Sequence, residues 1–195
     1  MAYYYLVAQL PCLLYEQKPP MSSQAFKDMA KSLMEEKDAA FMDCLSLNSD
    51  KIDFSSDEVS KTTGSDFIDQ WREWEHTLIL NLAKQRAIKL KRDIPAESPV
   101  YSVEPAAAAA KAIDEYSPLE AEIGLDKARW RAVNSLVGSV YFHRNNIFAY
   151  YLKLLLLERR QAFDADKGFT EYKSLYATII NNYESAQETS LGVQQ

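Results

Sequence analysis

The amino-acid sequence predicts an all-α protein, a bundle of roughly seven or eight long helices. Its 195 residues include only five Gly and seven Pro, and the abundance of Ala, Leu, Glu and Lys favours helices over a sheet. Apolar residues make up 47% of the chain, which is enough for a sizeable core. Along most of the chain they recur every three or four residues, the period of one helix face.

The N-terminal quarter of the chain predicts short helices joined by extended connections. The apolar block YYYLVAQL at 3–10 is interpreted as a short helix. The Pro19–Pro20 pair closes an extended connection, after which Ser22 or Ser23 can cap the next helix. A further short helix holds the apolar residues of 41–45.

A long helix is predicted from Asp66 to about Arg92, capped by Ser65. Its apolar positions form one stripe at helical spacing: Phe67, Ile68, Trp71, Trp74, Leu78, Leu82 and Ile88. Two segments that flank it, 48–65 and 93–105, are rich in Ser, Asp and Gly or in Pro, and both predict loops.

The SPLE motif that begins at Ser117 predicts another helix start. The serine caps, and Pro118 stands at the first helical position. The apolar face of this helix is expected to continue through Val140 and Tyr141.

The most apolar stretch, NNIFAYYLKLLLL at 145–157, predicts the central helix of the protein. A helix that is apolar on nearly every side needs neighbours on more than one face. The charged residues 158–160 follow, and Gly168 is expected to end this helix in a left-handed conformation. A second helix, beginning near Phe169 and apolar at helical spacing to Ile180, would complete a helical hairpin. The tail after Glu184 is expected to fray.

The whole chain, 1–195, is predicted to be a single helical domain. The alternative is two related lobes, 1–47 plus 117–195 and 66–115, joined by the loops 48–65 and 93–105. This alternative depends on a constant-offset match between two Leu-rich helices. The matching residues are Leu78, Leu80, Leu82 and Arg86 with Leu152, Leu154, Leu156 and Arg160.

Composition also bounds the function. A net charge of −6 argues against a nucleic-acid binder, and the basic run 84–92 is interpreted as a solvated helix end. The run 147–157 is shorter than the about 20 residues that span a bilayer, and no signal peptide is visible, so a soluble cytoplasmic protein is expected. Cys12 and Cys44 are interpreted as reduced, buried cysteines, because two cysteines define neither a disulfide framework nor zinc spacing.

No catalytic motif is found in the sequence. Glu73 and His76 have the Glu-x-x-His spacing of carboxylate-bridged metal sites, but the other histidine, His143, has Val140 three residues before it. We therefore interpret His76 as a surface or boundary residue and expect no metal. Nucleophile elbows and Gly-rich phosphate loops are absent from the sequence as well, so we expect a non-enzyme without cofactors.

Five residues near the C-terminal end of the central helix are candidates for partner binding: Tyr150, Tyr151, Glu158, Arg159 and Arg160. Tyrosine and arginine are common at protein interfaces. Two alternatives stay open, which are ordinary packing for the tyrosines and an intramolecular ion-pair cluster for the charged residues.

Three sequence blocks carry a resemblance to a known family. They are YYYLVAQLP with the following KPP, WREWEHTLILNLAKQRA, and AYYLKLLLLERRQAFDADKG. Together they resemble a small bacterial family of unassigned function whose members are encoded among the subunits of V-type (V/A-type) ATPases. The resemblance covers most of the chain, with the blocks in the family's order.

The third block is also similar to helices of the V-type ATPase component designated C, or d in eukaryotes, which we call the socket subunit. There a Tyr-Leu pair followed by Glu closes a helical lobe, and Tyr151, Leu152, Glu158 and Arg160 correspond to this motif. The socket subunit is longer and has three lobes, and Gln161 stands where it usually has Asn. That family is all-helical and forms a socket for the central axle on the membrane rotor ring.

The resemblance implies a non-catalytic subunit or assembly factor of a V-type ATPase, which lies at the inner face of the membrane and contacts the axle and the ring. A free-standing helical adaptor and, as a third possibility, a helical enzyme with a carboxylate metal site are the alternatives. A socket should expose an apolar patch beyond the few hundred Å² typical of a monomer. An enzyme should show a pocket with convergent titratable groups.

Overall fold

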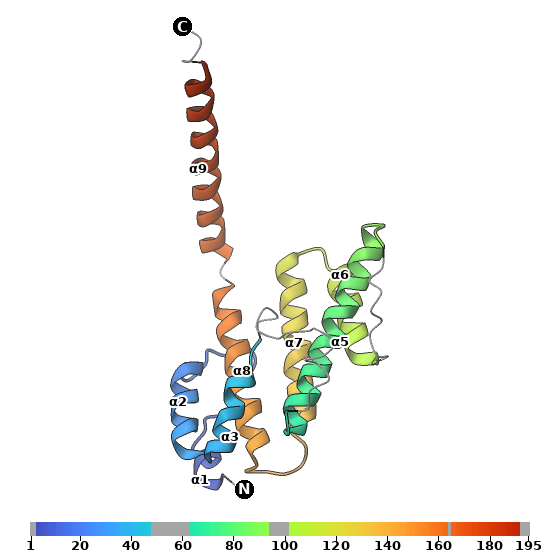
Figure 1. Cartoon of the computed structure of the whole chain (residues 1–195), viewed down its shortest axis with the longest axis vertical. Helices are drawn as coiled ribbons and strands as arrows, with labels where there is room; N and C mark the ends of the chain where they lie inside the picture. Colours follow the sequence, from blue (N-terminus) through green and yellow to red (C-terminus); the bar gives the residue numbers. More distant parts are fainter. Residues whose placement is uncertain (1–2, 48–62, 94–101, 164, 192–195) are drawn as a thin grey trace. The chain divides into compact units, whose positions relative to one another are not determined.

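The computed structural model describes residues 3–47, 63–93, 102–163 and 165–191 (Figure 1). In this part of the chain it contains eight α-helices, one 3-10 helix and no strand. The predicted all-α bundle is therefore confirmed. The chain divides into two compact units, Met1–Arg160 and Gln161–Gln195, and each is described by itself below.

The first unit begins with four short helices. They are α1 (Tyr4–Ala8), α2 (Ser23–Leu33), α3 (Glu36–Phe41) and the 3-10 helix η1 (Met42–Cys44). The backbone N–H of Ala25 donates to Ser22 Oγ at 3.2 Å, so Ser22, and not Ser23, caps α2. The short helix expected within 3–10 is present as α1. The segments 48–62 and 94–101, which belong to the two predicted loops, lie outside the described residues.

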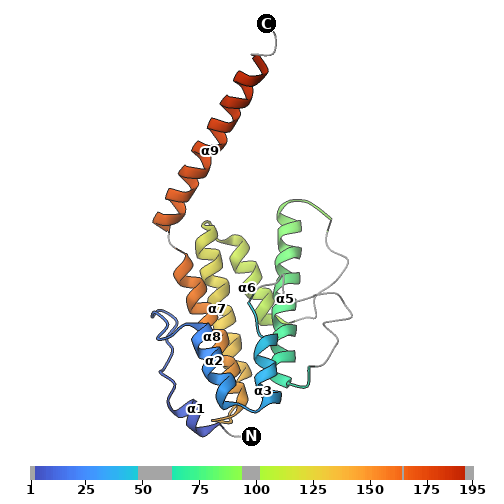
Figure 2. The same cartoon turned by 60° about the vertical axis from the view of Figure 1, so that its left-hand side comes forward.

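Three longer helices pack side by side in the middle of the chain (Figure 2). They are α5 (Asp66–Lys89), α6 (Val103–Asp114) and α7 (Pro118–Leu136). At the start of α7, the N–H of Glu120 donates to Ser117 Oγ, and Pro118 occupies the first position as expected. The predicted start of α7 is confirmed.

The start of α5 differs from the prediction. Ser65 precedes the helix, but its hydroxyl makes no capping hydrogen bond and is buried without a partner. Asp69, one turn into the helix, instead accepts from the N–H of Thr63 at 2.9 Å and from its hydroxyl at 2.7 Å. This carboxylate fixes the entry of the chain, so the predicted capping role of the Ser65 side chain is wrong.

The ends of α5 and α7 both use a residue in the left-handed region. Lys91 has φ +52°, and Arg92 N–H donates to Ala87 O at 2.9 Å, as in a Schellman motif. Gly138 has φ +72° just after α7. Because the helix stops there, Val140 and Tyr141 lie beyond it and are 64% and 81% exposed. Their predicted place on its apolar face is wrong.

The larger hydrophobic cluster of the first unit gathers around α8 (Arg144–Ala162). This helix contributes Ile147, Phe148, Leu152 and Leu154, all 0% exposed. They pack against Phe26 of α2, Met42 of η1, Phe67, Ile68 and Trp71 of α5, and Val133 of α7. The prediction of a central helix with neighbours on several sides is confirmed.

A smaller hydrophobic cluster lies among α5, α6 and α7. It consists of the buried residues Leu78, Leu82, Ala109 and Leu125. Ala109 comes from the poly-Ala run of α6, where small side chains let helices approach closely. Ile88, predicted on the same stripe, is 51% exposed, because it lies in the last turn of α5, past both clusters.

The second unit contains one long helix, α9 (Ala165–Leu191). Gly168 was expected to end the preceding helix, but α8 stops at Ala162 and Gly168 lies inside α9, without a positive φ. The chain there carries Asp164 and Asp166, acidic residues that suit the start of a helix. The predicted terminator is therefore wrong, and the break falls earlier. The backbone of α9 also continues past Glu184, where fraying was expected.

Candidate partner-binding surface

The five candidate residues on α8 make contacts within the first unit. Glu158 accepts from the backbone N–H of Ser23 at 2.6 Å and from its hydroxyl at 2.5 Å. A carboxylate at this place satisfies an N–H at the start of α2 and favours its dipole. Glu158 therefore ties the last turns of α8 to α2.

Arg159 joins α8 to α7. Its guanidinium donates to Glu122 Oε2 at 2.6 Å and lies 3.6 Å from Asp126 Oδ1. Asp126 is fully buried. Burial raises the pKa of the Asp126 carboxyl, although the charges of Arg159 and Arg129 act to lower it.

A buried ion pair extends this contact to α5. Arg129, on α7, donates through Nε and a terminal nitrogen to Glu75, on α5, at 3.1 Å and 2.7 Å, and a second nitrogen reaches Asp126 at 3.0 Å. Burial acts to lower the pKa of Arg129, but the charge of Glu75 outweighs it and raises that pKa. Three helices thus share one ionic network.

The sequence analysis did not identify this network. Glu75 and Arg129 are 3% and 6% exposed, although charged residues are almost never fully buried unless they are paired. The available signal was their position: each lies at helical spacing within a row of apolar core residues. A charge on the buried stripe of one helix predicts an opposite charge on a neighbour.

Arg160 packs on an aromatic side chain. Its guanidinium lies 4.7 Å from the ring centre of Tyr15, whose hydroxyl donates to Ile123 O at 3.2 Å and whose ring meets Trp130 edge-on. The cation–π contact holds the extended segment after α1 against α7 and α8. An intramolecular cluster, one of the two alternatives kept open above, therefore describes the contacts that all three charged residues make.

The two candidate tyrosines lie mostly inside the first unit. Tyr150 packs on Phe26 with ring centres 4.8 Å apart, and its buried hydroxyl has no hydrogen-bond partner among the described residues. Burial raises the pKa of Tyr150 to about 12. Tyr151 is 7% exposed, with Lys27 of α2 over its ring. Partner binding by the five residues remains a prediction.

A cavity of about 350 Å³ opens beside Tyr150. Its lining includes Cys12, Asn134, Asn146 and Lys153. Burial lowers the pKa of Lys153, whose ammonium lies 5.3 Å from the ring centre of Trp130. Cys12 is exposed, as is Cys44, so the prediction that both are buried is wrong: they lie in an extended connection and a 3-10 turn outside the core.

The Glu-x-x-His pair on α5 lies away from the core. Glu73 is exposed and His76 half-buried. Within the described ranges, no three His, Cys, Asp or Glu side chains lie close enough together to hold a metal ion.

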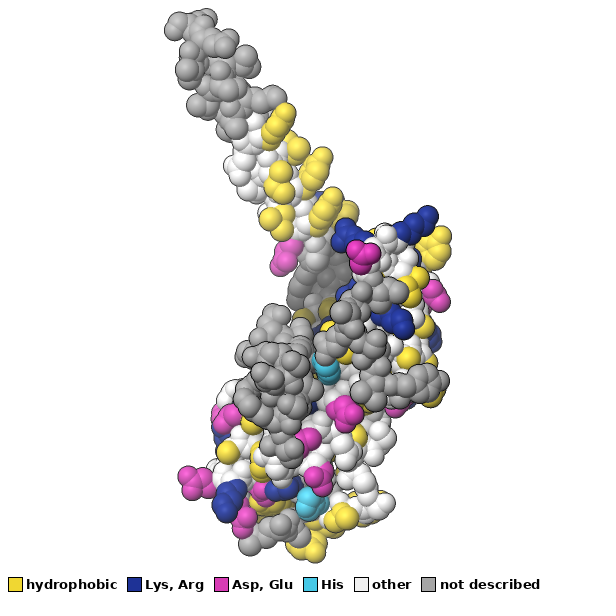
Figure 3. All heavy atoms as spheres, turned by 45° about the vertical axis from the view of Figure 1, so that its right-hand side comes forward, with side chains coloured by type: hydrophobic (Ala, Val, Ile, Leu, Met, Phe, Trp, Pro, Cys, Tyr) yellow, Lys and Arg dark blue, Asp and Glu magenta, His cyan; other side chains and the backbone are white. Residues whose placement is uncertain are grey.

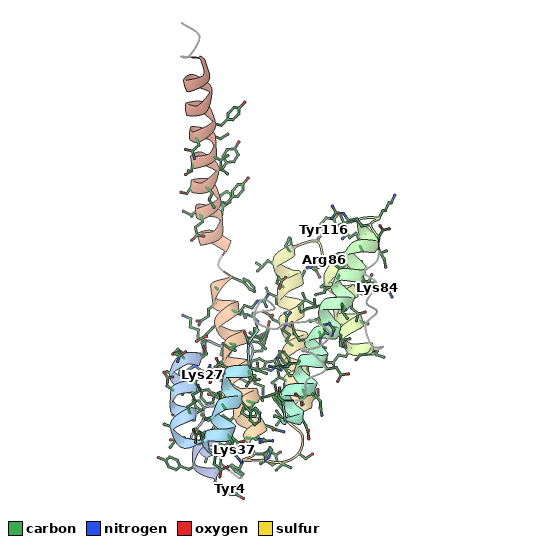
Figure 4. The ribbon with its side chains drawn as sticks, in the orientation of Figure 1. Tyr4, Lys27, Lys37, Lys84, Arg86 and Tyr116 are labelled. Atoms are coloured by element: carbon green, nitrogen blue, oxygen red, sulfur yellow. The ribbon has the colours of Figure 1, made fainter. Side chains whose placement is uncertain are left out.

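The basic run follows the C-terminal end of α5, as expected. Lys84 and Arg86 project from the last turns of the helix (Figure 4). The Lys89 ammonium donates to Ile113 O, near the C-terminal end of α6, at 2.6 Å. Cations at these positions complement two helix dipoles.

The largest exposed apolar surface is on α9, where the hydrophobic side chains gather on one side of the helix (Figure 3). We call this surface the α9 face and define it by Phe169, Tyr172, Leu175, Tyr176, Ile179 and Ile180. Five of the six are 57–63% exposed, and Ile180 is 37% exposed. The helical spacing of this segment was predicted, but its exposure was not.

An all-α protein with an exposed amphipathic helix is the class that these observations define. Residues 110–183 match the model of a family described only as a protein of unknown function, DUF2764. This match covers less than half of the chain and includes α7, α8 and the α9 face. No curated protein and no solved structure matches the chain. Among the described helices, none has the length and apolar character needed to cross a membrane.

Proposed function

We propose that this protein is a non-catalytic subunit or assembly factor of a V-type ATP synthase/ATPase. Its role is to couple the central rotor stalk to the membrane ring, and its partners are the axle and ring subunits at the inner face of the membrane. The proposal starts from the resemblance that residues 150–160 carry to helices of the socket subunit.

The observation that carries the proposal is the α9 face. Six large apolar side chains on one turn after another of a helix form a surface that monomeric proteins rarely expose. A protein that couples two others needs such a surface for its partners, whereas a self-contained regulator does not. The family match extends through this same helix, to residue 183.

The first unit supplies the rigidity that such a role requires. The buried network of Glu75, Arg129 and Asp126 joins α5 to α7, and Arg159 and Glu158 join α8 to α7 and α2. Paired charges fix the relative positions of helices because a displaced partner leaves a buried charge unpaired. A unit connected in this way transmits force between the surfaces it contacts.

The test is purification of the tagged chain from its native membranes at moderate salt, followed by identification of the co-purifying subunits. Recovery of the catalytic, axle and ring subunits in fixed ratio is the expected result. Recovery of soluble partners alone would favour the free-standing adaptor, and absence of the chain from an otherwise complete ATPase would contradict the proposal.

A matched pair of variants assigns the contact to the α9 face. Tyr176→Glu places a charge on the face, and Thr178→Glu places the same charge on the other side of the helix. We expect the first to lower the recovery of ATPase subunits at least tenfold and the second to leave it unchanged. Equal recovery with both variants would remove the α9 face from the interface.

A further inference from the structure

The α9 face has a stricter period than an ordinary amphipathic helix. Phe169, Tyr172, Tyr176 and Ile179 follow one another at intervals of three, four and three residues. This is the heptad spacing of a coiled-coil seam. Leu175 and Ile180 flank the seam, one on each side. A seam with a period of 3.5 residues fits another helix better than it fits a flat surface.

The first unit does not use this seam in its core. Its two hydrophobic clusters consist of residues between 3 and 155. The apolar positions of α8, which were expected to hold α9 in a hairpin, are already buried against other helices of that unit, including Phe26 and Trp71. The α9 face therefore requires a different helix.

From these observations we propose that in the free protein α9 pairs with α9 of a second copy as a parallel, in-register, two-stranded coiled coil. Each seam residue then faces its own counterpart across a twofold axis, the commonest symmetry of soluble oligomers. This inference does not depend on the ATPase assignment, because the face is available to a second copy whenever no other protein covers it.

The flanking residues and the charges favour the parallel arrangement. In a parallel pair, Leu175 of one copy faces Ile180 of the other on both sides of the seam, which widens the apolar contact. Lys173 then faces Gly168, whereas an antiparallel pair would bring two Lys173 side chains together. The segment 168–183 carries only two charged residues, Glu171 and Lys173, so a parallel pair brings no like charges face to face.

The apolar area is sufficient for a dimer. A buried aromatic side chain contributes about 150–250 Å², so six large side chains at the exposures given above offer on the order of 600 Å² per copy. Two copies would bury about 1,200 Å², the lower end of specific protein interfaces. Aromatic side chains also pack favourably on their own kind, and Tyr172 and Tyr176 already stack within one helix, 6.2 Å apart.

The first experiment measures the mass of the full chain in solution by sedimentation and light scattering at micromolar concentration and above. We expect twice the chain mass of 22.3 kDa. Ile179→Glu puts a charge into the seam and should yield the monomer, whereas Thr178→Glu, on the opposite side of α9, should remain a dimer.

The second experiment tests direction and register by disulfide formation. In a background with Cys12→Ser and Cys44→Ser, Ile179→Cys should form a disulfide between copies under mild oxidation, because facing seam positions lie within the 4.4–6.8 Å Cα separation that a disulfide needs, as a rough guide. Thr178→Cys should stay monomeric on a non-reducing gel.

Three results would overturn the inference. A wild-type chain that is monomeric throughout the concentration range excludes self-association. A dimer that survives Ile179→Glu excludes the seam as its interface. A dimer in which Ile179→Cys does not cross-link excludes the parallel register. A monomer whose thermal stability falls on Ile179→Glu would identify the chain's own first unit as the occupant of the α9 face.

Discussion

Tyr150 is a buried side chain whose hydroxyl has no partner among the described residues. An unsatisfied buried polar group costs about 1–3 kcal/mol. Replacing Tyr150 with Phe removes the hydroxyl and keeps the ring against Phe26. We therefore expect Tyr150→Phe to raise the free energy of unfolding by about 1 kcal/mol at neutral pH, measured by urea denaturation.

The same residue predicts a pH dependence. The pKa of Tyr150 is raised from 10.0 to about 12 in the folded protein, so the unfolded chain loses this proton first as pH rises. The folded state then binds more protons than the unfolded state, and stability falls between pH 10 and about pH 12. We expect a smaller fall in Tyr150→Phe. Tyr5→Phe, at a 75% exposed site, is the control, and an equal fall in both variants would contradict the assignment.

At single positions, sequence reasoning succeeded where the local chain determines the outcome. Ser117 and Pro118 start α7 because a cap needs only its own next three residues. Ser65 failed because Asp69 competes for the same backbone, and no rule on caps ranks the two. Glu158 was identified as a candidate, but its partner Ser23 is 135 residues away in sequence, and a single sequence does not specify such a pairing.

The ionic network is a property of helix pairs. Arg129→Met leaves Glu75 buried without its partner, and breaking a buried pair in this way costs about 3–5 kcal/mol. We expect the free energy of unfolding to fall by that amount in urea denaturation. The double variant Glu75→Leu with Arg129→Met should recover most of the loss, because apolar replacements of a whole buried pair are often neutral.

Two outcomes bear on that expectation. Arg131→Met changes an exposed arginine of the same helix and should cost less than about 0.5 kcal/mol. A double variant less stable than either single one would show that Glu75 and Arg129 contribute independently, contrary to the contacts between them.

The end of α5 predicts an effect of opposite sign at two lysines. Lys91 has φ +52°, where glycine is favoured over other residues. Lys91→Gly should therefore stabilise the protein by about 0.5 kcal/mol. Lys84→Gly, the same substitution on the exposed helix surface, should destabilise it by about 1 kcal/mol. Urea denaturation of both variants measures this, and two changes of the same sign would contradict the left-handed cap.

The helices themselves were largely predictable, because α2, α5, α7 and α8 each carry an apolar period that local sequence displays. Their ends were less so. Gly168 resembles a terminator, but the chain breaks before it, and Val140 continues an apolar pattern beyond the real end of α7. In both places a left-handed or broken backbone is selected by neighbours that the period does not register.

At the scale of the molecule, the sequence predicted one domain with the last helix folded back on the central one. The apolar stripe of α9 was read correctly as a buried-type face, but the helix lies in a unit of its own. Periodicity reports that a face needs covering and does not report which chain covers it. The same limit applies to the pairing of α5 with α7, which a charged residue in each apolar stripe could have suggested.

If the first unit is complete without α9, its stability should not depend on that helix. Ending the chain after Ala162 removes residues 163–195 and leaves both hydrophobic clusters and the ionic network in place. We expect the thermal midpoint of this truncated chain, followed by circular dichroism at low protein concentration, to differ from that of the full chain by less than about 2 °C, a shift that corresponds to roughly 0.5–1 kcal/mol at this size. The truncated chain should also be monomeric, since the α9 face is gone. A fall of about 10 °C or a broadened transition would show that α9 covers part of the first unit, and the exposed face would then belong to the fold of one chain and not to an interface.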